Sequence, residues 1–185
     1  EIGGIPATAN PLTLSQILRD EWKFKGMVVS DWTSILELLK HGIAGSRADA
    51  GVLSLQAGVD MDMEGRIYLL DLAQPLRDGK ISEDLVNRSV RRVLRMKFLL
   101  GLFSNPYRNC DSEAEKKTIL HKDHRSLARA VAQRSIVLLK NSKNILPLRK
   151  DLKTIAVVGP LADNRADLLG SWRGKGKPED VVTVL

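Results

Sequence analysis

The stretch Met27-Val28-Val29-Ser30-Asp31-Trp32 decides how this 185-residue sequence is interpreted. Its first four residues are a short, mostly apolar run with β-branched valines, which is typical of a strand buried on both faces. A carboxylate, Asp31, and an indole, Trp32, follow directly. Ligands of parallel α/β folds sit at the carboxyl ends of the strands, so this strand end is a candidate site.

Helical and strand patterns alternate around this stretch. Helices are predicted at 13–22 (with a capping box at Thr13-x-x-Gln16), directly after Trp32, and at about 46–56, 66–78 and 82–98 (capped by Ser82), with a second strand at Val59–Met63. This alternation of helices and strands predicts a parallel α/β structure, either a barrel or a doubly wound sheet. Two strands cannot close a barrel, so we expect this region to be the end of a larger domain.

The character of the sequence changes after Gly101. A turn-rich segment, Gly101–Asp111, is followed by predictions of a helix at about 123–140, a loop at 141–150, a buried strand at 154–160, a short helix at 163–169 and a glycine-rich loop at 170–177. We therefore expect a domain boundary between about 104 and 150.

Composition excludes several partners. The formal net charge is +7, but Lys and Arg are interleaved with Asp and Glu. The densest basic group, Arg88-Arg91-Arg92-Arg95-Lys97, has no interleaved aromatic residues, so we interpret it as a solvated helix face and not as a nucleic-acid site. No apolar stretch approaches a membrane span, and we predict no membrane partner. Cys110 is the only cysteine, which excludes an internal disulfide.

The residue pattern alone leaves the role of Asp31 open. Asp is a favoured N-cap, so Asp31 could cap the following helix as readily as act in catalysis. Trp32 favours the second interpretation, because an indole beside a strand-end carboxylate suits stacking on a sugar ring. A Trp packed beneath a loop remains the alternative.

Other polar residues carry weaker signals. Asp60 and Asp62 alternate on the second predicted strand, so we expect them on one face, where they would support the Asp31 loop or form an interior network. His41 is interpreted as a residue at a helix C-terminus. His121 and His124 lack a metal-ligand set, and Gly159-Pro160 lacks the glycine spacing of a dinucleotide site. We predict no metal and no cofactor.

Several motifs, taken in order and spacing, are specific. They are Gly4-Ile5-Pro6-Ala7, Leu18–Gly26, Val28-Val29-Ser30-Asp31-Trp32, Ala57–Met63, Val90–Leu94, Gly101-Leu102-Phe103-x-Asn105-Pro106-Tyr107, Ser135–Asn141, Leu146-Pro147-Leu148 and Ile155–Asp163. Together they resemble glycoside hydrolase family 3, particularly its bacterial β-glucosidases, over essentially the whole chain. One departure is Gly3, where relatives commonly have Asn or Asp.

The resemblance implies an architecture. Residues 1–104 would be the C-terminal part of a (β/α)8 TIM-type barrel, 105–150 a linker with a connecting helix, and 151–185 the start of an α/β sandwich domain. The chain would thus be a fragment of a longer protein that is periplasmic or secreted, although no signal peptide is visible.

The resemblance also implies a chemistry. Asp31 falls on the family's nucleophile, and Trp32 falls on an aromatic wall of the subsite beyond the scissile bond. The parent would be a retaining exo-β-glycosidase, with a small oligosaccharide or aryl glycoside as partner. The acid/base and the groups that hold the sugar hydroxyls would lie outside this chain, so we expect the isolated chain to be inactive.

Alternative functions stay open at this point. A β-xylosidase, a β-N-acetylglucosaminidase of the same family, or a non-catalytic carbohydrate-binding relative would each share these motifs. A phosphoacceptor domain also places Asp after an apolar strand, but it requires an acidic pair and a downstream Lys that are not recognisable here.

Overall fold

The two predicted strands lie side by side and parallel in the computed structural model, which describes residues 1–185. Val29 forms a parallel bridge with Met61, and the Ser30 amide donates to the Met61 carbonyl at 2.9 Å. The carbonyl of Val28 accepts from the amides of Asp60 and Met61. The pairing extends over one bridge only, because each segment has a partner on a single side. Parallel strands are stable mainly inside larger, covered sheets.

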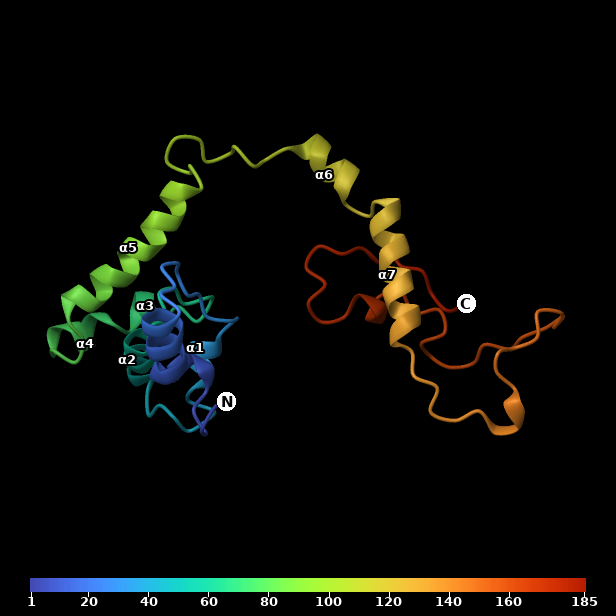
Figure 1. The fold of residues 1–185 in the computed structure, drawn as a ribbon, viewed down its shortest axis with the longest axis horizontal. Coiled ribbons are helices and arrows are strands. Elements are labelled where there is room, and N and C mark those ends of the chain that lie inside the picture. The colour runs from blue at the N-terminus through green and yellow to red at the C-terminus, as the bar shows by residue number, and fades with distance from the viewer. The chain divides into compact units, whose positions relative to one another are not determined.

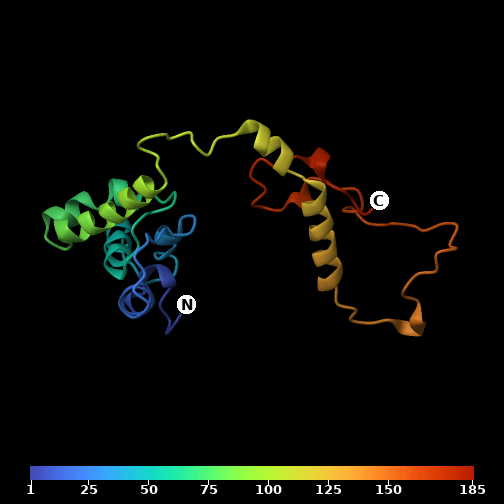
Figure 2. The same cartoon turned by 45° about the horizontal axis from the view of Figure 1, so that its top comes forward.

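The chain divides into two units, Glu1–Lys116 and Lys117–Leu185, which we call unit 1 and unit 2. Unit 1 contains two η helices and five α helices (Figures 1 and 2), namely η1 Ala7–Ala9, η2 Leu12–Glu21, α1 Ser34–Glu37, α2 Arg47–Ala57, α3 Ile67–Leu70, α4 Ala73–Arg77 and α5 Glu83–Leu99. The central helix is α2, which contacts η1, η2, α1, α3 and α5.

Local sequence signals explain how the two longest helices of unit 1 begin. The Ser46 hydroxyl accepts the Asp49 amide at the start of α2, and Gly58 ends that helix in the left-handed region at φ 119°. Ser82 caps α5 by accepting the Leu85 amide, as predicted. Acidic residues fill the first turn of α5, where they complement the helix dipole.

Two helix predictions need correction. The capping box at Thr13-x-x-Gln16 does not form. Instead Asn10 Oδ1 accepts the Leu12 amide at 3.0 Å, and the helix, wound as a π-helix, begins at Leu12. The helix predicted at 66–78 is broken at Asp71–Leu72 into α3 and α4, and Leu72 packs into the core at the break.

The core of unit 1 forms around α2. One cluster is Ala9, Ile35, Leu38, Ala50, Val59 and Ile67, and a second is Leu55, Leu72 and Ile81. Gly51 of α2 allows this packing, because a Cβ there would come within 2.8 Å of Ile67 Cγ2 and 2.9 Å of Leu72 Cδ2. Val59 belongs to the first cluster, so the core anchors the second strand segment.

Unit 2 is built differently. Its regular elements are α7 Lys122–Ser135, η3 Ser142–Asn144, η4 Asp167–Leu169 and η5 Pro178–Asp180, and α6 Ser112–Thr118 spans the junction of the units. The helix predicted to reach 140 ends at Ser135, and residues 136–140 are irregular. The strand predicted at 154–160 does not form, because no segment pairs with it. No helix of the structure has the length and apolarity to cross a membrane.

Candidate active site

Asp31 lies where the paired segments end. It is exposed and follows the buried Ser30 directly. Its Oδ1 accepts the Trp32 amide at 2.7 Å, while Oδ2 has no hydrogen bond in the structure. The N-cap position of α1 belongs to Thr33, so the capping role considered for Asp31 is not the one observed. The carboxylate is therefore presented to solvent with one oxygen free.

Trp32 is at the same edge. Trp32 is 48% exposed. The amide of the next residue, Thr33, donates to the Met63 carbonyl at 3.0 Å. The turn after the first segment is thus bonded to the turn after the second. The observed exposure does not match a Trp packed beneath a loop, which was the alternative interpretation.

Three of the seven non-glycine residues with positive φ lie at this edge. Thr33, Glu64 and Arg66 adopt positive φ values of 54°, 70° and 57°, a region that non-glycine residues rarely occupy. Such strain costs about 1–3 kcal/mol per residue and tends to cluster at functional sites. All three residues follow the carboxyl ends of the paired segments.

Asp60 is at the centre of a buried ion cluster. Its side chain is 0% exposed, and its two oxygens accept from Arg19 Nη2 at 2.6 Å and Arg92 Nη1 at 2.8 Å. The Val28 amide also donates to Oδ2 at 2.8 Å. Burial lowers the pKa of Arg19, and the attraction of Asp60 offsets part of that effect. The interior network that was one interpretation of Asp60 is therefore what the structure contains.

Arg92 is an exception to the solvated face predicted for the basic run on α5, whose other four residues are exposed. Its guanidinium is partly buried and bonds the buried Asp60 carboxylate. Leu85, Ser89 and Arg92 recur at helical spacing, and the first two face the packed side of α5. That spacing is the sequence signal from which the inward position of Arg92 could have been predicted.

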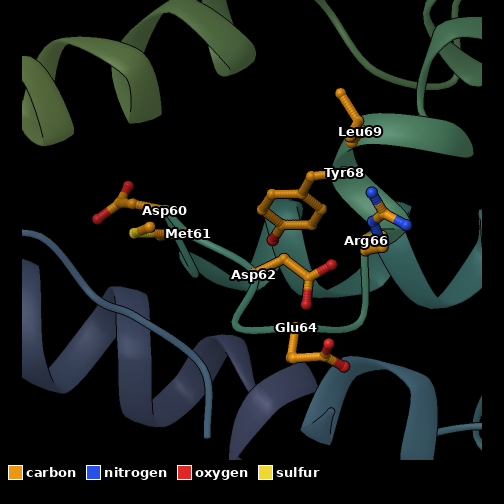
Figure 3. Close-up of a pocket in the computed structure, with 7 residues that line it drawn as sticks. All are labelled: Asp60, Met61, Asp62, Glu64, Arg66, Tyr68 and Leu69. Carbon is orange, nitrogen blue, oxygen red and sulfur yellow. The ribbon is translucent and has the colours of Figure 1, made fainter. Parts of the chain in front are cut away.

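Asp62 does not share a face with Asp60. Its Oδ2 accepts the Ile67 amide at 2.7 Å, and Figure 3 shows the Asp60 side chain directed away from it. The Tyr68 hydroxyl donates to the Val59 carbonyl at 2.9 Å. Burial, together with the nearby carboxylates, raises the pKa of Tyr68 well above its ordinary value. The prediction that the two side chains lie on one face is wrong, because the segment has strand geometry at one bridge only.

A depression of about 350 Å³ lies beside this segment (Figure 3). Its lining residues are Asp60, Met61, Asp62, Glu64, Arg66, Tyr68 and Leu69. Carboxylates and a guanidinium beside apolar side chains are groups suited to a polar organic ligand.

The histidines take other positions. His41 Nδ1 lies 3.2 Å from Glu1 Oε1 in an exposed contact. The His121 side chain accepts the Asp123 amide and caps α7. No group of three or more His, Cys, Asp or Glu side chains in residues 1–185 is placed to hold a metal ion.

Comparison with known proteins gives the same family that the sequence motifs indicated. Residues 1–96 match the description "Glycosyl hydrolase family 3 N terminal domain", and residues 136–185 match "Glycosyl hydrolase family 3 C-terminal domain". The chain is 43% identical to a periplasmic β-glucosidase of Salmonella typhimurium, across 100% of this chain and 24% of that protein. It is 33% identical to a xylan 1,4-β-xylosidase of Xylanibacter ruminicola, across 97% of this chain and 21% of that protein.

Solved structures give the same result. The crystal structure of a β-glucosidase from Listeria innocua is similar with a TM-score of 0.76 and 41% identity, over 98% of this chain and 25% of that one. Other structures of that enzyme hold isofagomine or, in a mutant, laminaribiose. These neighbours imply an α/β glycosidase fold, and the chain spans about a quarter of their length. The matches over both ends of the chain show that it belongs to glycosyl hydrolase family 3.

Proposed function

We propose that this chain is part of a retaining exo-β-glucosidase, in which Asp31 is the nucleophile. The observation that carries the proposal is the position of Asp31, an exposed carboxylate with one free oxygen at the end of a parallel pair of segments. Oxygen nucleophiles of this type form a covalent glycosyl-enzyme that water then hydrolyses.

The reaction has two steps. In the first, the free Asp31 oxygen bonds the anomeric carbon, the glycosidic C–O bond breaks, and an acid gives its proton to the departing oxygen. In the second, water attacks the same carbon, its proton passes to the group that served as acid, and the Asp31 carboxylate leaves. A retaining pair needs the second carboxyl group at roughly 5 Å, and the family resemblance assigns that group to a part of the enzyme outside these residues.

Trp32 serves the leaving part of the substrate in this proposal. Trp32 directly follows the nucleophile in the sequence, and an indole is a flat apolar surface of the kind on which a sugar ring stacks. The substrate class is therefore a β-glucosidic oligosaccharide or aryl glycoside, with the terminal non-reducing glucosyl residue bound at Asp31.

The proposed architecture follows the same reasoning. Residues 1–104 would complete a (β/α)8 barrel, 105–150 would be a linker with a connecting helix, and 151–185 would begin an α/β sandwich domain. The parallel segments around Val29 and Met61 support the first assignment, since adjacent parallel strands are the repeating unit of such a barrel. The name of the Salmonella relative supports a periplasmic or secreted location.

A β-xylosidase is the second candidate, because relatives with that name match almost the whole chain. A xylosyl residue lacks the hydroxymethyl group of glucose, so the two activities are separated by the ratio of kcat/KM for aryl β-glucoside and aryl β-xyloside. A ratio that favours the xyloside would replace the glucosidase assignment and leave the role of Asp31 intact.

The nucleophile is tested by labelling. We expect the full-length enzyme, treated with an activated 2-deoxy-2-fluoro-β-glucoside and digested, to carry the fluoroglucosyl mass on the peptide that contains Asp31. Turnover of the substrate with the label on a different residue would refute the assignment. The isolated 185-residue chain should not hydrolyse an aryl β-glucoside.

A further inference from the structure

Ser30 is buried beside the proposed nucleophile, and both of its hydroxyl contacts are to backbone groups. The residue is 6% exposed. Its Oγ accepts the Met63 amide at 2.8 Å and lies 2.9 Å from the Asp31 carbonyl oxygen. A serine hydroxyl has one proton, and an amide can only donate, so that proton is directed to the Asp31 carbonyl. The hydroxyl therefore links the turn after Met61 to the backbone of Asp31.

The peptide group between Asp31 and Trp32 is bonded at both ends. Its carbonyl accepts from Ser30 Oγ and from the Ser34 amide, the latter at 3.2 Å. Its N–H donates to Asp31 Oδ1 at 2.7 Å. A peptide group is planar, so fixing its carbonyl also fixes the direction of its N–H. That N–H in turn holds one oxygen of the Asp31 carboxylate.

We propose that Ser30 is a positioning residue that orients the Asp31 carboxylate through the plane of the Asp31–Trp32 peptide. The inference rests on the proposed function of Asp31 and assigns to Ser30 no contact with substrate. Its effect is geometric, because it keeps Oδ1 turned toward the Trp32 amide and leaves Oδ2 facing solvent. A displacement of about 1 Å in a reacting group can cost on the order of 100-fold in rate.

The alternative is a purely structural serine that only joins the two strand segments. That role would lower stability without a specific effect on the glycosylation step. The two roles are separated by the rate at which a fluoroglucoside traps the enzyme, because trapping reports the attack by Asp31 itself. The two roles also differ in how the loss of activity divides between kcat and KM. A positioning role lowers kcat and leaves KM nearly unchanged.

The experiment compares Ser30→Ala and Ser30→Thr in the full-length enzyme. We expect Ser30→Ala to lower kcat and the trapping rate constant by about 10- to 100-fold, with KM for an aryl glucoside within about threefold of wild type. Ser30→Thr keeps the hydroxyl and should recover most of the trapping rate. Ser54→Ala is the matched control, because Ser54 is also buried and its hydroxyl has no partner. It should trap at the wild-type rate.

Several results would overturn the proposal. One is a folded Ser30→Ala enzyme with wild-type trapping, and another is a folded Ser30→Thr enzyme as slow as Ser30→Ala. If Ser30→Ala does not fold, Ser30→Cys replaces it, since a thiol fills similar space with a weak donor. Wild-type trapping by that variant would also exclude the role. Failure of the proposed function is a different observation, namely a wild-type enzyme whose label is not on Asp31.

Discussion

The two units of this chain contain similar kinds of residues but bury them very differently. Unit 1 packs a core around α2 in which Ile35, Leu38 and Ile67 are 0% exposed. Unit 2 has no buried residue, and Leu139 and Val158 are 92% and 91% exposed. Apolar sequence therefore does not by itself make a core. A core forms where two or more elements can close on one another, as α1, α2 and α3 do here.

The ion pairs of the two units also differ in burial. In unit 1, Asp60 is enclosed between Arg19 and Arg92, with a backbone amide as a further donor. In unit 2, Asp151 pairs with Arg149 at the surface. A buried pair is costly to break because the remaining charge is left without solvent, whereas an exposed pair is replaced by water. The same ionic contact thus has different consequences in the two units.

The largest expected effect separates the units by function. Asp31→Ala in the full-length enzyme should reduce kcat/KM for an aryl β-glucoside by more than about a thousandfold, because the covalent step is lost. Asp151→Ala in unit 2 is the control and should retain wild-type kinetics. A loss below about tenfold for Asp31→Ala, in a folded enzyme, could not be reconciled with an essential nucleophile.

The next effect compares the two ion pairs. Asp60→Asn should lower the free energy of unfolding by about 3–5 kcal/mol, because Arg19 and Arg92 would then face a neutral amide in a buried site. Urea unfolding of the 185-residue chain, followed by tryptophan fluorescence, measures the change. Asp151→Asn should leave the midpoint where it is, and equal midpoints for both variants would remove the contrast between the units.

A third comparison uses two leucines. Leu38→Ala creates a cavity in a fully buried site and should cost about 2–4 kcal/mol, whereas Leu139→Ala removes a side chain that is 92% exposed and should leave the unfolding midpoint of the chain unchanged.

The full-length enzyme sharpens this third test. The match to the family's C-terminal domain begins at residue 136, before the proposed start of the sandwich at 151. If residues 136–140 pack within that domain, Leu139→Ala should lower the melting temperature of that enzyme as well. An unchanged melting temperature would leave residues 136–140 in the linker assigned to 105–150.

The smallest expected effect concerns pH. Hydrogen bonding from Arg149 lowers the pKa of Asp151 below its ordinary value. A depressed pKa contributes stability above the ordinary value, and this contribution is lost as the pH falls through the depressed one. Arg149→Gln should therefore raise the pKa of Asp151 toward 3.8, measured by carboxyl carbon NMR. The same pKa in both proteins would mean that the ion pair does not form.

The sequence predicted local features well. The N-cap of α5 and the position of Asp31 after an apolar run follow from residue type and spacing over a few positions. The alternation of helix and strand patterns predicted that the segments around Val29 and Met61 lie parallel. Two of the errors arose where a predicted element has no tertiary partner in the chain. The 154–160 strand had the right composition but no partner, and the helix to 140 ended where apolar residues had nothing to pack against.

The sequence by itself determined the family and the identity of the candidate nucleophile, because the order and spacing of the motifs can be recognised without knowledge of the fold. Only the tertiary structure decided the surroundings of that nucleophile. Asp60 meets Arg19 across 41 positions, and Ser30 meets Met63 across 33. Contacts at such separations depend on how helices and segments pack, and no local propensity encodes them. Asp31 is thus a residue that sequence can identify and that only packing can orient.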